Sequence, residues 1–258
     1  MNAALIFMHI PKCGGTTLRS ILKGEVPASR RFRVGSDIAA SRAALAALPD
    51  STRLNIDLLY GHLSYGWHEL LFPRQAWYFT IMREPVARVV SHYNYVRSHE
   101  WHYLYSQVVD ARMTVADYVE SGITTEVNNG QVRQISGVED IVQAPYGRSP
   151  VAYGDDHRGL LEQAWVNIDR HFLLVGLLER FHDTVRRLQP LTGLRTGSSE
   201  PKNVDRSNPA PRIPTPNEVD IIRRFNREDC ELYNRCKEAF DLGNGRIERL
   251  RRLLLGRF

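Results

Sequence analysis

The segment H-I-P-K-C-G-G-T-T-L near the N-terminus combines groups that bind a phosphate. Lys12 supplies a positive charge, and Gly14 and Gly15 let a ligand approach the backbone closely. Thr16 and Thr17 add hydroxyl donors at the start of a predicted helix, whose first N–H groups have no partner within the helix. Because such a helix start attracts anions, we predict an anion-binding loop, although a Gly-Gly turn can also be purely structural.

The order of these residues differs from that of a Walker loop. In the motif G-x-x-x-x-G-K-[ST] the lysine follows the glycines, whereas Lys12 precedes them. The sequence therefore predicts a lysine that approaches the phosphate from the strand side, without the usual arrangement for Mg²⁺. Cys13 lies between the lysine and the glycines, either as a small loop residue or as a thiol whose pKa the neighbouring charge lowers.

A second segment, R-E-P-V-A-R-V-V-S-H-Y, follows another apolar run. Arg83 ends a predicted strand, and Ser91 lies about two turns into a helix that begins at Pro85. Open α/β sheets bind ligands at the carboxyl ends of their strands, so we expect the planar guanidinium of Arg83 beside the first loop, where it suits a phosphate. In the alternative interpretation, Arg83 pairs with Glu84 or Asp57 and Ser91 lies on a solvated helix face.

Strands and helices alternate along the chain and must position these segments. Apolar runs predict strands at residues 4–10, 58–60, 77–82 and 172–178. Helical spacing of apolar residues predicts helices at 16–23, 36–48, 85–99 and 217–240. We therefore expect an α/β fold with a central, mainly parallel sheet covered by helices on both faces. Residues 1–258 are interpreted as one domain with loops at 143–156 and 195–216 and a basic amphipathic tail at 241–258.

The composition is that of an ordinary globular protein. A length of 258 residues predicts one domain or at most two, and 43% apolar with 24% charged residues exclude disordered, collagen-like and fibrous chains. The net charge of +5 weakly favours anionic partners. Three cysteines without paired spacing indicate a reducing compartment. No apolar stretch approaches the roughly 20 residues that span a bilayer, and no signal-peptide pattern is present, so we expect a cytoplasmic protein.

Together the two segments resemble the cofactor-binding motifs of Golgi-type carbohydrate sulfotransferases and their bacterial relatives. The similarity is greatest to the heparan sulfate 2-O- and 6-O-sulfotransferases, which use 3′-phosphoadenosine 5′-phosphosulfate (PAPS) and have a P-loop-NTPase-like three-layer α/β fold. The resemblance implies that the 5′-phosphosulfate is bound by Lys12, Gly14, Gly15, Thr16 and Thr17, and we count Cys13 of the same loop with them. It also implies that Arg83 and Ser91 bind the 3′-phosphate.

Four softer matches extend the resemblance over about residues 4–240. The segment Y-G-H-L-S-Y is similar to the one that holds the catalytic histidine of the 2-O-sulfotransferases, which places His62 there. The segment N-N-G-Q-V-R-Q is similar to a stretch of the 6-O branch that faces acceptor and cofactor, which implies substrate-binding roles for Asn129 and Arg133. The late segment K-N-V-D-R-S implies that Arg206 and Ser207 close over the 3′-phosphate and adenine. The segment V-G-L-L-E-R-F matches a late strand and helix start.

These residues suit sulfuryl transfer. With an ordinary pKa of about 6.5, His62 can accept the acceptor's proton, while Lys12 stabilises the leaving phosphate. Any single one of the nine histidines is more often structural than catalytic. Because lysine and arginine can neutralise the phosphates, and His92, His99 and His102 lack the spacing and partners of metal ligands, we predict no metal.

The remaining features leave alternatives open. Trp101 lies in an aromatic stretch that could stack on a sugar or simply pack its loop. The tail could contact an anionic polymer, a membrane surface or a partner helix, or dock by its leucine face.

The expected function is transfer of a sulfuryl group from PAPS to a hydroxyl of a carbohydrate or glycoconjugate. An ATP-dependent small-molecule kinase is opposed by the absence of the Walker order and of a clear Mg²⁺-binding aspartate after a strand. A non-catalytic module for anionic glycan or nucleic acid is opposed by the scattered arginines and the lack of a nucleic-acid motif, so we expect no nucleic-acid partner.

Overall fold

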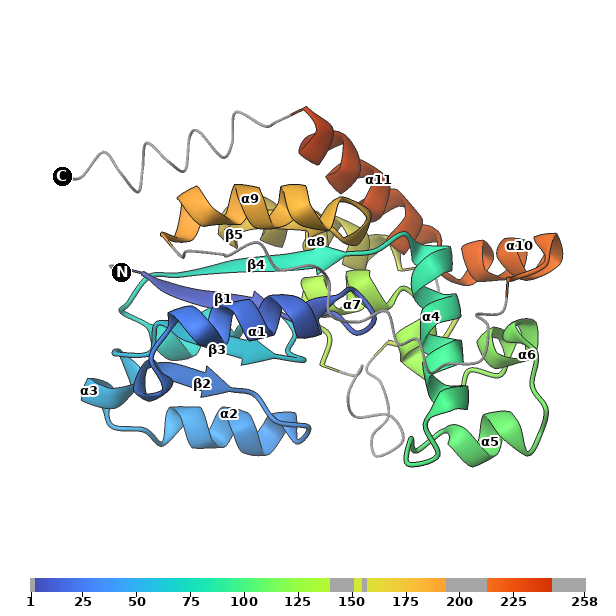
Figure 1. The fold of residues 1–258 in the computed structure, drawn as a ribbon, viewed down its shortest axis with the longest axis horizontal. Coiled ribbons are helices and arrows are strands. Elements are labelled where there is room, and N and C mark those ends of the chain that lie inside the picture. Colours follow the sequence, from blue (N-terminus) through green and yellow to red (C-terminus); the bar gives the residue numbers. More distant parts are fainter. Residues whose placement is uncertain (1–2, 140–150, 155–156, 194–212, 243–258) are drawn as a thin grey trace.

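The protein is described by a computed structural model that covers residues 3–139, 151–154, 157–193 and 213–242. Within these ranges five strands form one parallel sheet in the order β2-β3-β1-β4-β5 (Figure 1). The strands are β1 (Ala4–Met8), β2 (Arg31–Arg33), β3 (Leu58–Gly61), β4 (Ala76–Met82) and β5 (Phe172–Leu177).

The apolar runs form the inner strands because both faces of a parallel sheet are covered. All five residues of β1 are buried, and Phe7 lies opposite Tyr60 of β3 and Phe79 of β4. The predicted strands are confirmed with ends shifted by a few residues. The sequence analysis missed β2, whose R-F-R sequence places arginines at both ends of a short edge strand.

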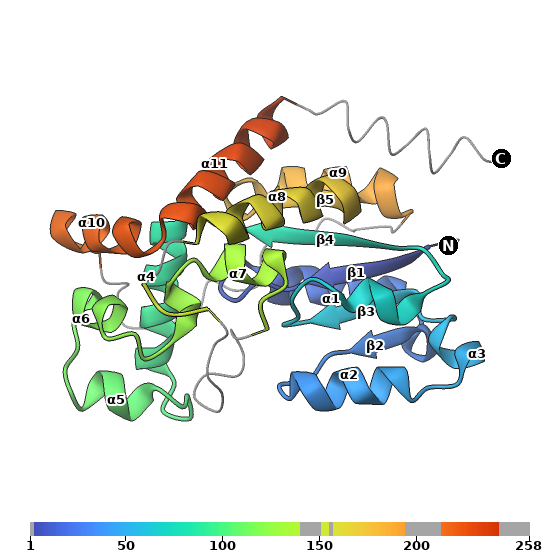
Figure 2. The same ribbon diagram turned by 180° about the vertical axis from the view of Figure 1, so that it is seen from behind.

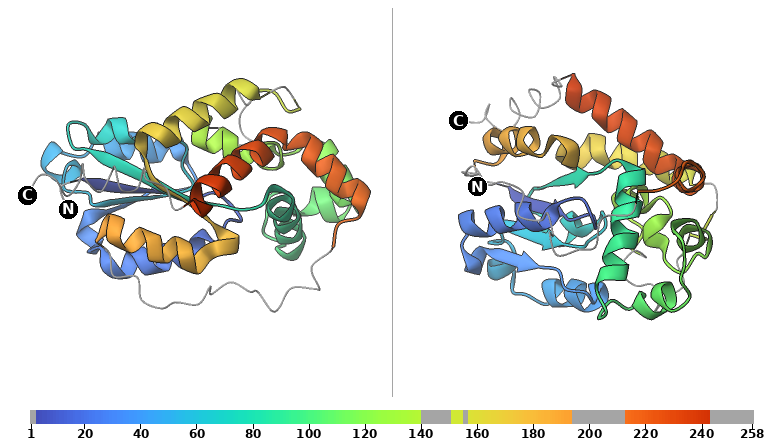
Figure 3. Two further views of the ribbon diagram at one scale, coloured as in Figure 1. Left: turned by 90° about the horizontal axis from the view of Figure 1, so that it is seen from above. Right: turned by 45° about the vertical axis from the view of Figure 1, so that its right-hand side comes forward.

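Helices cover both faces of the sheet. On one face lie α1 (Gly15–Glu25) and α9 (Phe181–Thr192), and on the other lie α7 (Gly130–Ser136) and α8 (Arg158–His171), as the opposite views of Figures 1 and 2 and the view from above in Figure 3 show. The three-layer α/β arrangement expected from the sequence is therefore confirmed.

Shorter elements complete the sheet half of the molecule. The edge beside β2 carries α2 (Ile38–Ala46) and α3 (Asp50–Arg53), and Asp37 caps α2 by accepting a hydrogen bond from the Ala40 N–H at 2.8 Å. Short 3₁₀ turns lie at η1 (Ala28–Arg30), η2 (Trp67–Leu71), η3 (Thr125–Val127) and η4 (Leu178–Arg180).

A second group of helices lies beyond the carboxyl ends of the strands (Figure 1). It contains α4 (Pro85–Ser98), α5 (Tyr105–Val109), α6 (Val115–Glu120) and α10 (Pro216–Phe225). These helices share an apolar cluster separate from the core around the sheet, with Val89, Tyr118 and Ile222 among its fully buried members. The carboxyl ends of the strands therefore face a group of helices that pack against one another.

The single helix predicted over residues 217–240 is wrong in one respect. The structure contains two helices, α10 and α11 (Arg227–Asp241), joined at Asn226. The buried Asn226 amide donates to the carbonyl oxygens of Ile222 and Val127 at 2.9 and 2.8 Å, and this tertiary contact turns the chain.

Some sequence-based predictions lie wholly or largely outside the described residues. These are the loops at 143–156 and 195–216, the tail at 241–258, and the cofactor contacts of Arg206 and Ser207. Among the described helices, none has the length and apolar character to cross a membrane.

Candidate functional site

The turn between β1 and α1, here called the Lys12 loop (residues 9–14), has a conformation that depends on Gly14 and on Gly15, the first residue of α1. Gly14 precedes α1 with a φ of 74°, and Lys12 also has a positive φ, 66°. A Cβ on Gly15 would lie 1.9 Å from Cδ2 of His9, and a Cβ on Gly14 would lie 2.5 Å from Cδ1 of Leu178. Both positions therefore require glycine.

The first turn of α1 has the character of an anion site. It contains no acidic residue, and no side chain caps it. As at any helix start, its first N–H groups point out of the helix, here toward the Lys12 loop, at the positive end of the helix dipole. Thr16 is half-buried and Thr17 is buried at this helix start.

The structure brings Arg83 to the Lys12 loop. Strands β1 and β4 are neighbours, and Nη1 of Arg83 donates a hydrogen bond to the backbone carbonyl of Lys12 at 3.2 Å. The alternative partners are engaged elsewhere: Asp57 pairs with Arg30 and Arg74, and Glu84 caps α4. Two motifs separated by some 70 residues thus meet at adjacent strand ends.

These strand ends form the topological switch point of the sheet. The chain leaves β1 toward β2 and β3 on one side and leaves β4 toward β5 on the other. Ligands of open α/β sheets bind at the carboxyl ends of the two strands where the direction changes. The contact between Arg83 and Lys12 lies at this point.

Helix α4 supplies a third side to the site. Nζ of Lys12 lies 3.8 Å from the centroid of the Tyr95 ring, a cation–π contact. Ser91 precedes Tyr95 by four residues and therefore lies on the same face of α4. Trp101 is 72% exposed, and its ring meets the Tyr95 ring edge-on at 5.9 Å, so it extends the aromatic group outward from Lys12.

His62 follows β3, on the other side of β1. Its Nδ1 lies 2.9 Å from the carbonyl oxygen of His9 and donates to it, which leaves the lone pair of the neutral ring on Nε2. Burial lowers the pKa of His62, and the nearby Glu126 carboxylate only partly opposes this. The structure therefore provides a neutral imidazole beside the Lys12 loop.

His9 links this imidazole to the loop. Its ring stacks on the His62 ring at 4.3 Å and on the Phe7 ring at 5.7 Å, and its edge packs against Gly15. Burial, reinforced by the nearby His62, Arg19 and Lys12, holds the pKa of His9 well below its usual range. His9 is thus a neutral spacer between the rest of the Lys12 loop and His62.

The Cys13 side chain points into the protein. It is 1% exposed, and its Sγ lies 3.7 Å from Oε1 of Gln131 and 3.6 Å from the carbonyl oxygen of Pro11. Burial raises the pKa of Cys13 to about 12 despite the nearby arginines. The possibility of a lowered thiol pKa is therefore wrong, and the Cys13 N–H is also engaged, since it donates to the Ile10 carbonyl at 3.3 Å.

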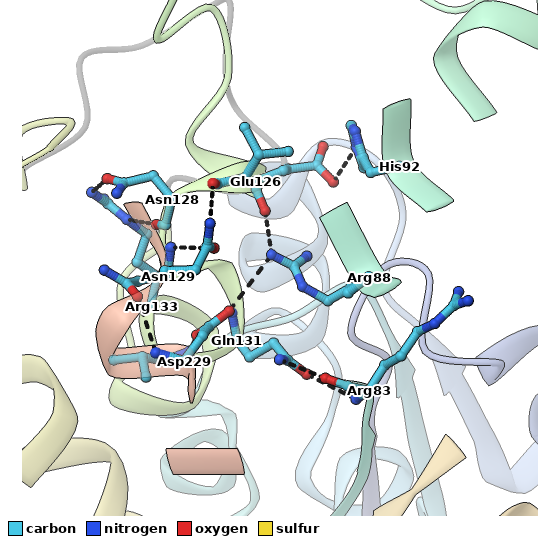
Figure 4. A network of polar contacts seen from close by, with 12 residues as sticks. Arg83, Arg88, His92, Glu126, Asn128, Asn129, Gln131, Arg133 and Asp229 are labelled. Carbon is cyan, nitrogen blue, oxygen red and sulfur yellow. Dashed lines mark hydrogen bonds and ion pairs between the residues drawn. The ribbon is translucent and has the colours of Figure 1, made fainter. Parts of the chain in front are cut away.

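Asn129 and Arg133 belong to a buried polar network (Figure 4). The Asn129 amide donates to Glu228 at 2.7 Å, and the Arg133 guanidinium donates to the side chain and backbone of Asn128 at 3.0 and 2.8 Å. The bond from Asn129 to Glu228 holds the start of α7 against α11, whereas the bonds from Arg133 to Asn128 tie α7 to the residues just before it. The structure does not bring either side chain to the Lys12 loop, so their assignment to acceptor binding stays a prediction without geometric support.

Three site residues were missed by the sequence analysis: Tyr95 beneath Lys12, Glu126 near His62, and Gln131, whose amide contacts Arg83. Glu126 also binds Nε2 of His92 at 2.9 Å; although burial raises the pKa of Glu126, this imidazole lowers it below its usual value. Gln131 lies in the N-N-G-Q-V-R-Q segment that the sequence analysis had already singled out.

Within the described ranges, no group of three or more histidine, cysteine, aspartate or glutamate side chains could hold a metal ion. The search against protein-family models gave no match to this chain, and no curated protein is significantly similar to it in sequence. The site is therefore interpreted from its own geometry.

Proposed function

We propose that the protein is a PAPS-dependent sulfotransferase that acts on a hydroxyl of a carbohydrate or glycoconjugate. The observation that carries the proposal is the hydrogen bond from Arg83 to the Lys12 carbonyl. It joins the two segments predicted to bind phosphate, here called the phosphate-type motifs, at neighbouring strand ends. A nucleotide with phosphates at both its 3′ and 5′ positions meets a positive group for each: Arg83, and the Lys12 loop with the start of α1.

Sulfuryl transfer needs a base for the acceptor's proton and positive groups that stabilise the leaving phosphate. A bond forms between the acceptor oxygen and sulfur while the bond between sulfur and the phosphate oxygen breaks, and the acceptor loses its proton. Nε2 of His62 takes the proton in this scheme, because its lone pair is free in the neutral ring. Lys12 and the N–H groups at the start of α1 stabilise the negative charge that develops on the departing phosphate.

The kinase alternative has less support. Mg²⁺-dependent phosphoryl transfer uses an acidic residue at a strand end, and the residues that directly follow β3 and β4 are His62 and Arg83. A non-catalytic glycan-binding module leaves unexplained why a neutral imidazole is held beside the Lys12 loop. The three cysteines are free thiols, which fits the cytoplasmic location that we also propose.

Calorimetry separates these functions. A sulfotransferase binds adenosine 3′,5′-bisphosphate in the absence of Mg²⁺, a kinase binds ATP only with Mg²⁺, and a glycan-binding module binds neither. Transfer of radiolabelled sulfate from PAPS to a panel of carbohydrates then identifies the acceptor. Binding of Mg²⁺-ATP alone, or of no nucleotide, would contradict the proposal.

A further inference from the structure

The short helix α7 lies behind the strand ends that carry the site, and one of its side chains touches both phosphate-type motifs. Gln131 is completely buried. Its Oε1 accepts a hydrogen bond from the Arg83 N–H at 3.0 Å, and its Nε2 donates to the Arg83 carbonyl at 3.0 Å. The same Oε1 accepts the Cys13 thiol at 3.7 Å. A single amide thus holds the end of β4 and the Lys12 loop.

The amide is suited to this position and few other groups are. The Arg83 backbone offers one donor and one acceptor, and a side chain must supply the complementary pair in one plane. A carboxylate has no hydrogen to donate and would place a negative oxygen against the Arg83 carbonyl oxygen, and an apolar side chain would leave two backbone groups buried without partners. In Figure 4 the guanidinium of Arg83 extends away from Gln131, so the amide fixes the backbone while the charged group reaches the Lys12 loop, where its Nη1 donates to the Lys12 carbonyl.

Gln131 is itself held rigidly. The carboxylate of Asp229, on α11, accepts the N–H groups of Gln131 and Val132 at 3.2 and 2.7 Å. Asp229 is fully buried and lies 3.6 Å from Nη2 of Arg88, a residue of α4. The start of α7 is therefore tied to both α4 and α11 (Figure 4).

A second glutamine on the same side of α7, Gln134, makes similar contacts with the segments that follow β1 and β3. Gln134 follows Gln131 by three positions, and its Nε2 donates to the carbonyl oxygens of His9 and Leu63 at 3.2 and 2.7 Å. His9 begins the Lys12 loop, and Leu63 directly follows His62. Two glutamines of one helix thus span the ends of β3, β1 and β4.

We propose that Gln131 is a positioning residue that sets the separation between Arg83 and the Lys12 loop, and thereby the preference for a nucleotide phosphorylated at both ends over one phosphorylated only at its 5′ end. The choice of nucleotide rests on the proposed function, whereas the joining of the two backbones does not. Gln131 acts through Arg83 and has no contact with the ligand.

The first test measures this preference by calorimetry with adenosine 3′,5′-bisphosphate and adenosine 5′-phosphate. Gln131→Met keeps the length of the side chain and removes its hydrogen bonds, and we expect the affinity ratio of the two nucleotides to fall about tenfold. In the Arg83→Ala background the same substitution should change the ratio no further, because the positioned group is gone. Additive losses in the double variant would overturn the inference.

The second test needs no ligand. The Arg83 N–H should be protected from hydrogen exchange in the wild-type protein and should lose protection in Gln131→Met. The matched control is Asn167→Leu, because Asn167 is also a buried amide that bonds to α7, through the carbonyl oxygens of Ile135 and Ser136 at the far end of the helix. The control should leave Arg83 protected.

The outcomes separate the two hypotheses. If the wild-type protein binds neither nucleotide, the proposed function fails and hydrogen exchange alone decides the role of Gln131. Unchanged exchange at Arg83 in Gln131→Met, or equal loss of protection in the control, would overturn that role. If Gln131→Met does not fold, Gln131→Asn replaces it, since it keeps an amide that is one methylene too short to reach, and the same loss of protection is expected.

Discussion

At the scale of single residues, the site is defined by which groups carry charge and which do not. His62 and His9 are neutral imidazoles stacked on one another, and Lys12 is the adjacent cation. The hydrogen bond from Nδ1 of His62 to a backbone carbonyl fixes the tautomer. A base with this tautomer and a low pKa is ready to accept a proton near neutral pH.

The first prediction concerns His62 and pH. A protonated His62 cannot act as a base, so transfer should fall as the pH drops through its pKa. Because burial lowers that pKa, the midpoint in kcat/KM should lie below the ordinary histidine value of about 6.5. His62→Ala should reduce turnover by about 100-fold or more while nucleotide affinity changes little. An acid limb centred above pH 6.5, or a matching loss of nucleotide affinity, would assign His62 another role.

At the scale of elements, the Lys12 loop depends on close packing between a strand and the helix that follows it. The His9 ring occupies the space where any larger residue at 15 would place its Cβ. The helix begins tightly against the strand end, which aims its N–H groups at the loop. The geometry of this helix start is thus set by the packing of His9 against Gly15.

The second prediction tests this packing. Gly15→Ala should destabilise the fold by about 1–3 kcal/mol, because a Cβ 1.9 Å from the His9 ring forces the ring or the helix to move. It should also weaken nucleotide binding. Gly24, on the same helix, has no neighbour within 4 Å of its would-be Cβ, so Gly24→Ala should instead stabilise the protein by about 0.5–1 kcal/mol. Urea denaturation of both variants provides the comparison, and equal effects would refute the packing argument.

The elements also show what the sequence could predict. β1, β4 and α4 carry local signals, an apolar run or a proline at the helix start, and these elements were predicted. The α8 helix also has a local signal, with Leu161, Ala164 and Ile168 at helical spacing, but it was not predicted. β2 and the break at Asn226 depend on partners distant in sequence, so no local pattern reveals them.

The site residues also differ in whether local sequence or distant partners determine their positions. The meeting of Lys12 and Arg83 follows from the parallel pairing of two predicted strands, and it was expected. The burial of Asn129 and Arg133 depends on residues such as Glu228 and His157, which lie far along the chain. A polar segment rich in amides has the same appearance in sequence whether it faces a ligand or holds the interior together.

At the scale of the whole molecule, the buried histidines make the fold sensitive to acid. His9 is 7% exposed and stays neutral in the folded protein because its pKa is held well below the usual range. In the unfolded chain it takes up a proton below pH about 6.5. The unfolded state therefore binds more protons than the native state in this range, and stability falls as the pH falls from 6.5 toward the lowered pKa.

The third prediction is the size of this effect. His9 should contribute a loss of about 1.4 kcal/mol of unfolding free energy for each pH unit below 6.5, until the pH reaches its folded pKa. His9→Leu should reduce the slope of stability against pH by that amount, whatever its effect on stability at neutral pH. Urea denaturation between pH 4.5 and 7.5 measures both slopes. Identical slopes in the two proteins would show that His9 is not the neutral spacer described above.

The central claim is that one nucleotide spans the Lys12 loop and Arg83. The most direct measurement compares the affinities of adenosine 3′,5′-bisphosphate and adenosine 5′-phosphate for the wild-type protein and for Arg83→Ala at one ionic strength. We predict that the wild type prefers the bisphosphate and that Arg83→Ala loses about 10- to 100-fold in affinity for it, with little change for adenosine 5′-phosphate, because only the 3′-phosphate loses its charged hydrogen bonds. An equal loss for both nucleotides, or no preference in the wild type, would contradict the account.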